Sequence, residues 1–368
     1  MMMRHVSMND FRADPESLVR AELDACERVL RSGWWILGKE VSAFEQVWVE
    51  RTGARFAVGC GNGVDAIEIA LRALSIGSGD EVITTPMTAF ATVLAIIRAG
   101  ATPVLADIDP DTAMLDPQSV ERCVGPRTRA VVLVHLYGQV GPVLELNELA
   151  TRHGLALIED CAQAHGAMLA GIGAGNFGAC AAWSFYPTKN LGAVGDAGAL
   201  TTNSLEIAEA GRSLRNYGQS VRYHHPVIGM NSRLDELQAA ILLARLPYLT
   251  EWTQRRRAIA RRCAAEFKAP DVRVLPLPGD QHRHVHHLFV VTTPRRDELQ
   301  THLKKNEIDS LIHYPIPVHL QPPCRDISRD RSGLANAEEH ARTCVSLPCH
   351  PAMTDEDIDA VIAAVNAF

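Results

Sequence analysis

Short apolar segments alternate with helical stretches along the first half of the chain. This alternation restricts the possible folds of the chain more than any other feature of its sequence. The apolar segments cover residues 81–85, 103–107, 130–135 and 155–159, and apolar residues at helical spacing cover 65–75 and 144–153. Strands that alternate with helices are typical of parallel sheets, because a parallel return needs a crossover connection. The pattern therefore predicts an α/β fold with a mostly parallel sheet covered on both faces.

The pattern changes near Leu234. The sequence predicts helical structure over 234–267 with an interruption at Pro247, a strand around 286–292, a helix over 296–305 and a terminal helix from Asp355. A chain of 368 residues with 47% hydrophobic content can bury a large core and is long enough for two domains. We expect a large domain over residues 1–245, with a helical segment at its start, and a smaller α/β domain over residues 246–368.

The charge balance argues against nucleic acid or a membrane surface as a partner. The chain has 36 basic and 43 acidic residues, a net charge of −7, and no long basic run. No apolar run reaches the ~20 residues of a membrane span, and the first residues lack the apolar stretch of a signal peptide. Nine Cys residues without a CxxC pair favour reduced thiols. The expected location is the cytoplasm.

Lys189 is the first candidate catalytic residue. Only five of the 36 basic residues are Lys, and Lys189 is alone between Lys39 and Lys268. A chain that uses Arg for most positive charges tends to keep Lys where chemistry needs an amine that can lose its proton and attack a carbonyl. The surrounding stretch SFYPTKNLGAVGDAG is rich in Gly and turn residues that can hold one amine against a flat ligand. The alternative, a solvated surface charge, is the commoner role of a single Lys.

Asp160 is the second candidate. It lies in GLALIEDCAQAHG, residues 154–166, directly after an apolar run that reads as a buried parallel strand. Ligands bind at the carboxyl edge of such a sheet. A pyridoxal phosphate (PLP) site needs a carboxylate beside the ring nitrogen, because a protonated ring accepts electrons better. The alternative is a helix cap or loop acid, which is the more frequent outcome for one Asp after a strand.

A glycine-rich turn, VGCGNGVDAIEIA at residues 58–70, is the third feature. Three glycines lead into a segment with apolar residues at helical spacing. Free backbone N–H groups at a helix start bind anions, and glycines let the backbone approach a phosphate. The turn is not a P-loop, because no Gly-Lys-Ser/Thr follows, and its glycines do not fit the dinucleotide fingerprint G-x-G-x-x-G. A plain turn without a ligand remains open.

The fifteen His residues invite a metal interpretation, above all in QHRHVHH at residues 281–287. The alternating spacing suits a strand of the smaller domain better than a set of ligands, and no Cys is placed to complete a zinc site. We therefore expect no metal.

Taken together, the chain resembles the DegT/DnrJ/EryC1/StrS family of PLP-dependent sugar aminotransferases. The resemblance covers nearly the whole length and implies PLP fold type I, like aspartate aminotransferase, with PLP as the cofactor. The matching motifs, in chain order, are GWWILG (33–38), CGNGVDA (60–66), PMTAFAT (86–92), DIDPDTAMLDP (107–117), HLYGQ (135–139), EDCAQAHG (159–166), SFYPTKNLG (184–192), LRNYGQ (214–219), MNSRLDELQAA (230–240) and HYPIPVHLQ (313–321).

The family pattern assigns roles around the cofactor ring. It implies that Lys189 forms an imine with the cofactor and acts as the acid-base group, and that Asp160 pairs with the ring nitrogen. Gln163 would face the phenolic oxygen, and Phe90 would stack on the ring. Taken singly, Phe90 reads as an ordinary core aromatic and Gln163 as an exposed helix residue.

The family pattern also assigns residues to the cofactor phosphate. The backbone of Gly63 and Val64, the hydroxyl of Ser184, and Asn231 of a second subunit would hold it. Without the resemblance, Ser184 and Asn231 read as caps or turn residues. Two positions depart from the usual pattern: Val64 stands where many relatives carry Thr or Ser, and Ala197 replaces a frequent Gly. Neither change removes a reacting group.

The resemblance implies ping-pong transamination from L-glutamate, which leaves as 2-oxoglutarate, to a nucleotide-linked keto-sugar, in a homodimer with shared active sites. The motifs FYPTKNLG and HYPIPVHLQ are most similar to enzymes that aminate C3 of nucleotide-linked 3-keto-6-deoxyhexoses. Amination at C4 of a 4-keto-6-deoxyhexose is the alternative, although such enzymes more often carry His and Thr-Gly-Glu around the lysine. Side chains that flank the motifs and could bind hydroxyls or a diphosphate are Tyr186, Tyr217, Arg222, Tyr314 and His319.

Three other functions remain open. A dehydratase with the same cofactor would carry His in place of Lys189. A non-catalytic regulatory protein could keep the fold and the cofactor. A nicotinamide oxidoreductase would need the dinucleotide fingerprint that the sequence lacks.

Overall fold

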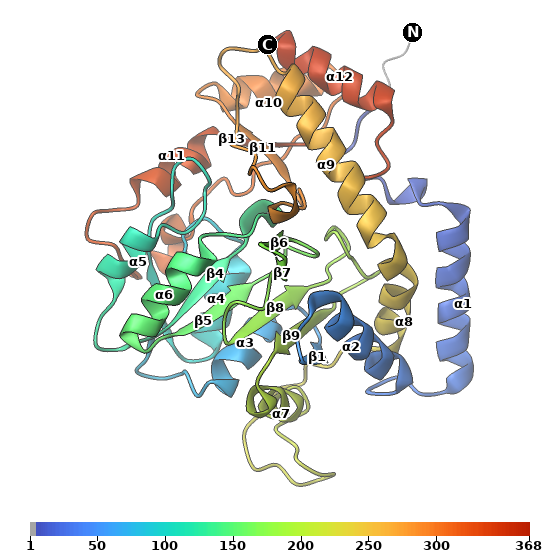
Figure 1. Ribbon diagram of the computed structural model, residues 1–368, viewed down its shortest axis with the longest axis vertical. Coiled ribbons are helices and arrows are strands. Elements are labelled where there is room, and N and C mark those ends of the chain that lie inside the picture. The colour runs from blue at the N-terminus through green and yellow to red at the C-terminus, as the bar shows by residue number, and fades with distance from the viewer. Residues whose placement is uncertain (1–4) are drawn as a thin grey trace.

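The structure, a computed structural model, describes residues 5–368 (Figure 1). The expectation that the chain starts without a signal peptide falls partly on residues 1–4, outside the described residues. Within residues 5–368, no helix combines the length and the apolar content that crossing a membrane requires. All nine Cys are free thiols in this part of the chain, as the sequence predicts.

An eight-stranded sheet in the order β1-β9-β8-β5-β4-β2-β3-β12 forms the centre of the larger part. The strands are β1 (Phe56–Cys60), β2 (Glu81–Thr84), β3 (Thr102–Leu105), β4 (Thr128–Val134), β5 (Ala156–Asp160), β8 (Cys180–Ser184), β9 (Gly198–Thr202) and β12 (Ser328–Arg329). Neighbours pair in parallel from β12 through to β8. The pairs β8–β9 and β9–β1 are antiparallel. The mostly parallel sheet is confirmed.

Helices cover both faces of this sheet (Figure 1). One layer contains α2 (Lys39–Thr52), α5 (Pro117–Cys123), α6 (Val143–His153) and α8 (Glu236–Arg245), and the other contains α3 (Gly63–Ala73), α4 (Phe90–Arg98) and α7 (Leu205–Leu214). Alternation along β4 shows why two layers form: Val131 and Leu133 pack into the first core, and Ala130 and Val132 into the second. Helix α1 (Glu16–Ser32) packs on α8.

The C-terminal part has its own three-stranded antiparallel sheet and core. Its elements are α9 (Leu249–Glu266), β10 (Arg273–Val274), β11 (Phe289–Thr292), α10 (Arg296–Lys305), α11 (Ala335–Thr343), β13 (Cys344–Leu347) and α12 (Asp355–Asn366). The remaining elements are the hairpin β6 (Met168–Leu169) and β7 (Ile172–Gly173) and the short 3-10 helices at Phe11–Ala13, Leu136–Gly138, Leu246–Tyr248, Gln281–Arg283, Val318–Leu320 and Pro322–Cys324. The boundary at residue 245 stays a prediction, and backbone pairs cross it: β12 pairs with β3, Val6 bridges Ile308, and Gln139 bridges His284.

The prediction of a strand across residues 281–287 is wrong. Residues 281–283 form a 3-10 helix, and β11 begins only at Phe289. The segment pairs instead with residues 138–140: the Val140 N–H donates to the Arg283 carbonyl and the Val285 N–H to the Gly138 carbonyl, at 2.9 Å each. Arg257 of α9 donates to the carbonyl of His284 at 2.9 Å. The backbone groups of residues 283–285 are thus satisfied outside the sheet of β11 and β13.

Candidate active site

Asp160 and Lys189 meet at the carboxyl edge of the central sheet. Asp160 is the last residue of β5, in register with Val134 of β4 and Ala182 of β8. The loop after β8 returns Lys189 toward this edge, and its N–H donates to the Tyr186 carbonyl at 2.8 Å. The sequence therefore places Asp160 correctly at a strand end and Lys189 correctly in a turn-rich segment, and the parallel register brings them close in space.

Each of the two charges affects the protonation of the other. Burial lowers the pKa of Lys189 to about 8, although the negative charge of Asp160 raises it in part. Burial raises the pKa of Asp160, while the Ala162 N–H, the Thr92 hydroxyl and the charge of Lys189 lower it. A buried amine that loses its proton this readily can serve as a nucleophile and a base near neutral pH.

Hydrogen bonds hold both oxygens of the Asp160 carboxylate. Oδ1 accepts from the Ala162 N–H at 3.1 Å, and Oδ2 accepts from the Thr92 hydroxyl at 2.9 Å. Thr92 belongs to α4, 68 residues earlier in the chain. The sequence did not single out Thr92, although it lies in the PMTAFAT motif two residues after Phe90.

The start of α3 forms a cradle of backbone N–H groups, the kind of site that the sequence predicts for the cofactor phosphate. Asn62 caps the helix by accepting the Asp65 N–H at 2.9 Å. Asp65 is in turn held by the Asn62 amide at 3.0 Å and by the Ser232 hydroxyl at 2.7 Å. The first N–H groups of a helix have no partner within it, so those of Gly63 and Val64 remain for a ligand. This is the geometry that the glycine-rich turn predicts.

Gly63 and Ser184 lie against each other across this cradle. A Cβ on Gly63 would come within 2.7 Å of the Ser184 Cβ, closer than real Cβ atoms approach. Ser184 ends β8, next to β5 in the sheet. Only glycine therefore lets the α3 backbone and the Ser184 hydroxyl face the same small volume.

Gln163 is a buried residue, which rules out the exposed helix position that it suggests when taken singly. Its Oε1 accepts the Tyr137 N–H at 2.6 Å, and its Nε2 donates to the Tyr314 hydroxyl at 3.2 Å. Burial and the charge of Asp160 raise the pKa of Tyr314 to about 12. Among the five proposed substrate contacts, Tyr314 is the one that the structure ties to Gln163 and Asp160.

Phe90 opens α4 and keeps 38% of its surface exposed. The core position that Phe90 suggests when taken singly is therefore wrong. An exposed aromatic in the helix that also carries Thr92 is available to stack on a flat ligand beside Asp160.

The other proposed substrate residues lie in different surroundings. Tyr186 and Tyr217 are exposed on loops. Arg222 is exposed and stacks on Tyr223, with its guanidinium carbon 5.0 Å from the ring centre. His319 is buried, and its Nε2 lies 3.1 Å from a Glu338 oxygen. These four assignments stay predictions.

Asn231 lies on the surface and forms an isolated bridge with Asn216. Among the described residues, no hydrogen bond joins Asn231 to Gly63, Val64 or Ser184 of its own chain. An exposed side chain is free to reach a neighbouring subunit, so the assignment of Asn231 to a second active site stays a prediction.

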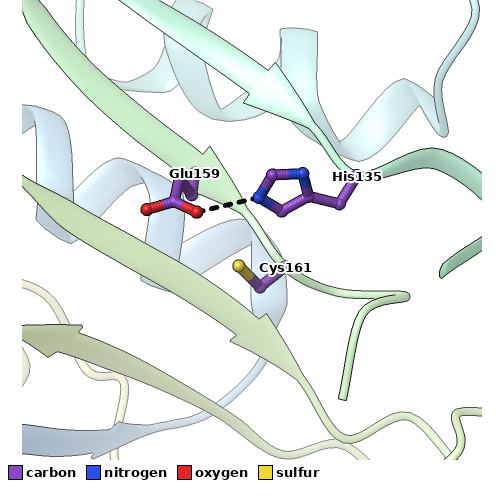
Figure 2. A group of neighbouring side chains, drawn as sticks. All are labelled: His135, Glu159 and Cys161. Atoms are coloured by element: carbon purple, nitrogen blue, oxygen red, sulfur yellow. Dashed lines mark hydrogen bonds and ion pairs between the residues drawn. The ribbon is translucent and has the colours of Figure 1, made fainter. Parts of the chain in front are cut away.

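A buried cluster of His135, Glu159 and Cys161 lies beside Asp160 (Figure 2). Glu159 accepts from His135 Nε2 at 2.9 Å and from the N–H groups of residues 175, 177 and 178 at 2.8 Å each. His135 Nδ1 accepts the Gly141 N–H at 3.1 Å, so Nε2 carries the proton.

These bonds occupy the atoms that a metal ion would need. Burial most strongly opposes the ionisation of Glu159, but the bonds from His135 and the backbone bring its pKa below the ordinary value. Burial raises the pKa of the Cys161 thiol well above its usual range, which keeps it protonated. The cluster therefore acts as a hydrogen-bonded network that fixes the loop of residues 175–178 to the end of β5.

The DegT/DnrJ/EryC1/StrS aminotransferase family matches residues 16–366 of the chain. The chain is 46% identical to a dTDP-3-amino-3,4,6-trideoxy-alpha-D-glucose transaminase of Streptomyces venezuelae, over 98% of this chain and 95% of the relative. It is 45% identical to a dTDP-3-amino-3,6-dideoxy-alpha-D-galactopyranose transaminase of Aneurinibacillus thermoaerophilus, over 94% of each. A pleiotropic regulatory protein of Geobacillus stearothermophilus is 43% identical, over 99% of this chain and 98% of the relative.

Two solved structures share the fold closely. DesV of S. venezuelae, in complex with a ketimine intermediate, superposes with a TM-score of 0.95 at 44% identity, over 99% of this chain and 98% of DesV. NtdA of Bacillus subtilis, with bound cofactor PMP, superposes with a TM-score of 0.90 at 28% identity, over 99% of this chain and 86% of NtdA. The fold is therefore that of PLP fold type I sugar aminotransferases, as predicted.

Proposed function

The chain belongs to the DegT/DnrJ/EryC1/StrS aminotransferase family, and on this premise we propose that it is a PLP-dependent aminotransferase acting on C3 of a nucleotide-linked 3-keto-6-deoxyhexose. The relatives from S. venezuelae and A. thermoaerophilus, named for dTDP-linked 3-amino sugars, support C3 over C4. The observation that carries the proposal is the pairing of a low-pKa Lys189 with a buried Asp160 at one edge of the sheet.

The residues at this edge fit PLP. Gly63 and Ser184 leave a cradle that a single added Cβ would fill, next to the N-terminus of α3. A phosphate suits such a cradle, because the helix N-terminus carries a positive dipole and free N–H groups. Asp160 is a buried acid that would be neutralised by a protonated ring nitrogen, and Phe90 is an exposed aromatic on the neighbouring helix.

When bound, PLP supplies an aldehyde for covalent capture of amines and a ring that accepts electrons. Lys189 then provides the attacking amine and, once released, takes the proton from Cα of the amino donor at its Nζ. Asp160 keeps a proton on the ring nitrogen through its negative charge. Val64 contributes only backbone to the phosphate, so Ser184 is the hydroxyl that this chain offers there.

The donor and the assembly are finer parts of the proposal. L-glutamate, released as 2-oxoglutarate, is the proposed donor. The proposed unit is a homodimer in which Asn231 reaches the phosphate of the partner's cofactor. Gln163 is the proposed partner of the phenolic oxygen of the ring, and its hydrogen bonds to Tyr137 and Tyr314 support this role by fixing the amide.

A spectroscopic experiment tests the function. Purified protein loaded with PLP should show the visible band of a lysine-bound cofactor, which L-glutamate bleaches and a nucleotide-linked 3-keto-6-deoxyhexose restores. Borohydride reduction and peptide mapping should locate the label on Lys189, with the Lys189→Arg variant unlabelled because Arg stays protonated. Restoration by a 4-keto-sugar alone would move the function to C4. A protein without any band, with or without added PLP, would be a non-catalytic relative.

A further inference from the structure

Two buried threonines form a hydrogen-bonded chain that ends on Asp160. Thr92 Oγ1 donates to Asp160 Oδ2 at 2.9 Å, and Thr88 Oγ1 lies 2.8 Å from Thr92 Oγ1. Thr88, Thr92 and Asp160 are all buried. Buried hydroxyls persist where they are paired, but pairing alone does not explain why this acid faces a hydroxyl from another element. The roles assigned above use neither threonine.

The direction of this chain follows from the chemistry of its groups. An ionised carboxylate only accepts hydrogen bonds, so Thr92 must give its single hydroxyl proton to Asp160. Thr92 then has only lone pairs to offer Thr88, so Thr88 donates to Thr92. If Asp160 were protonated on Oδ2, that oxygen would need an acceptor and the arrangement would have to reverse. With Asp160 ionised, as pairing with a protonated ring nitrogen requires, the chain of donors runs from Thr88 through Thr92 to Asp160.

Asp160 needs hydrogen bonds and nearby positive charge to stay ionised, because burial disfavours its negative charge. Four groups offset the burial, namely the Ala162 N–H, the Thr92 hydroxyl, the Lys189 amine and His135. The Lys189 charge is absent whenever the amine is neutral, and its pKa of about 8 brings that state closer to neutral pH than for an ordinary lysine. The two hydrogen bonds to Asp160 remain in that state, and the Thr92 hydroxyl is the one of the two that a substitution can remove.

We propose that Thr92, oriented by Thr88, is a positioning residue that keeps Asp160 ionised and aimed at the ring nitrogen of the cofactor. This inference rests on the proposed function, in which Asp160 faces that nitrogen. Phe90 lies between the two threonines at the start of α4. The start of α4 would therefore supply both Phe90, which stacks on the cofactor ring, and Thr92, which through Asp160 keeps the ring nitrogen protonated.

The Thr92→Val variant removes the hydroxyl and keeps the shape of the side chain. With PLP labelled at the ring nitrogen, NMR of the holoenzyme should show that nitrogen less protonated than in the wild type. The single-turnover rate with L-glutamate should fall roughly tenfold or more, as expected for loss of a hydrogen bond to a charged group. Thr92→Ser, which keeps the hydroxyl, should restore both. Thr88→Val should have a smaller effect than Thr92→Val, because Thr92 can still donate.

A matched control separates this role from packing. Thr84 on β2 is also buried, and its hydroxyl donates to the Val132 carbonyl at 3.0 Å without contacting Asp160. Thr84→Val should lower thermal stability and leave the ring nitrogen protonated. If Thr92→Val fails to fold, Thr92→Ala removes the same hydroxyl for the same measurements.

The outcomes separate this inference from the proposed function. If the wild type transaminates but the ring nitrogen stays protonated in Thr92→Val and Thr92→Ala, the positioning role is wrong and the proposed function stands. A Thr88→Val effect as large as that of Thr92→Val would overturn the direction of the chain. Failure of the wild type to bind PLP would remove the proposed function itself.

Discussion

At the scale of single residues, the site depends on two ionisable groups whose surroundings oppose their charged forms. Lys189 and Asp160 are both buried deeply enough for their ionisation to shift, and each stabilises the charge of the other. Burial is the larger influence on both. The amine is therefore available as a neutral nucleophile well below the pH at which an exposed lysine would be.

This shift predicts the pH dependence of cofactor capture. Only the neutral amine attacks, and its fraction grows as the pH rises through the pKa. The rate at which the apoenzyme captures PLP, followed by stopped-flow absorbance, should reach half its maximum at about pH 8 and not at the ordinary lysine value of 10.5. Asp160→Asn removes the charge that raises the Lys189 pKa, so the midpoint should move to lower pH. Asp196→Asn, an exposed acid on the same loop, should leave it unchanged.

A midpoint near the ordinary lysine value would show that Lys189 is solvated in the apoenzyme. A midpoint that does not move in Asp160→Asn would show that the two groups are not coupled.

At the scale of elements, residues far apart in the chain hold the helix starts around the site. The N-terminus of α2 has no capping side chain of its own, and Glu236 of α8 supplies one. Its carboxylate accepts the N–H groups of Gly38 at 2.7 Å, Glu40 at 2.9 Å and Val41 at 3.0 Å. An acid at a helix start also complements the helix dipole.

Replacing Glu236 should therefore destabilise the fold. Glu236→Ala leaves the buried N–H of Val41 and the part-buried N–H groups of Gly38 and Glu40 without acceptors. The free energy of unfolding should fall by about 2–3 kcal/mol. Denaturant titration would measure the change. Glu251→Ala, at an exposed acid near the start of α9, should cost less than about 0.5 kcal/mol. Equal losses in the two variants would show that the cap adds nothing.

The approach of α3 to β8 makes a second prediction at this scale. Gly63→Ala adds a methyl group that meets Ser184 at 2.7 Å, although Ala is the better helix former by up to ~1 kcal/mol. PLP affinity should fall about tenfold or more because the phosphate cradle is displaced. Gly279→Ala, where an added Cβ meets nothing within 4 Å, should leave it unchanged. Fluorescence titration of the apoenzymes compares them. Unchanged affinity in Gly63→Ala would place the phosphate elsewhere.

At the scale of the whole molecule, two of the segments that expose apolar side chains bear on assembly. Trp34 and Trp35 lie between α1 and α2, and Tyr223, Val227 and Ile228 lie in the loop after α7. Large exposed apolar groups mark interaction surfaces. They support the proposed homodimer, in which the segment that follows this loop carries Asn231 into the second site.

Mixing two inactive variants tests the shared sites. Lys189→Ala removes the nucleophile, and Asn231→Asp places a negative charge against the phosphate. If the sites are shared, a mixed dimer has one site with both defects and one with neither, so up to half the normal activity per mixed dimer should return. Labelled subunits would confirm that exchange occurs. Exchange without recovery would assign Asn231 to the site of its own subunit.

The sequence predicted the central sheet well, because the relevant signals are local. Apolar runs bounded by turns located β2, β3, β4 and β5 to within two residues at each end. Helical spacing located α10 and the start of α12 correctly. The glycine turn also located the start of α3, and the phosphate site assigned to it stays a prediction.

By itself, therefore, the sequence determined the fold class, the order of the elements, the strand end at Asp160 and the turn-rich segment that carries Lys189. Only the tertiary structure decided which groups pair with them: Thr92 reaches Asp160 across 68 residues, and Glu236 caps α2 across almost 200. Local spacing records which face of an element is apolar. The partner of a buried polar group comes from distant chain segments, and is defined only once the sheet brings those segments together.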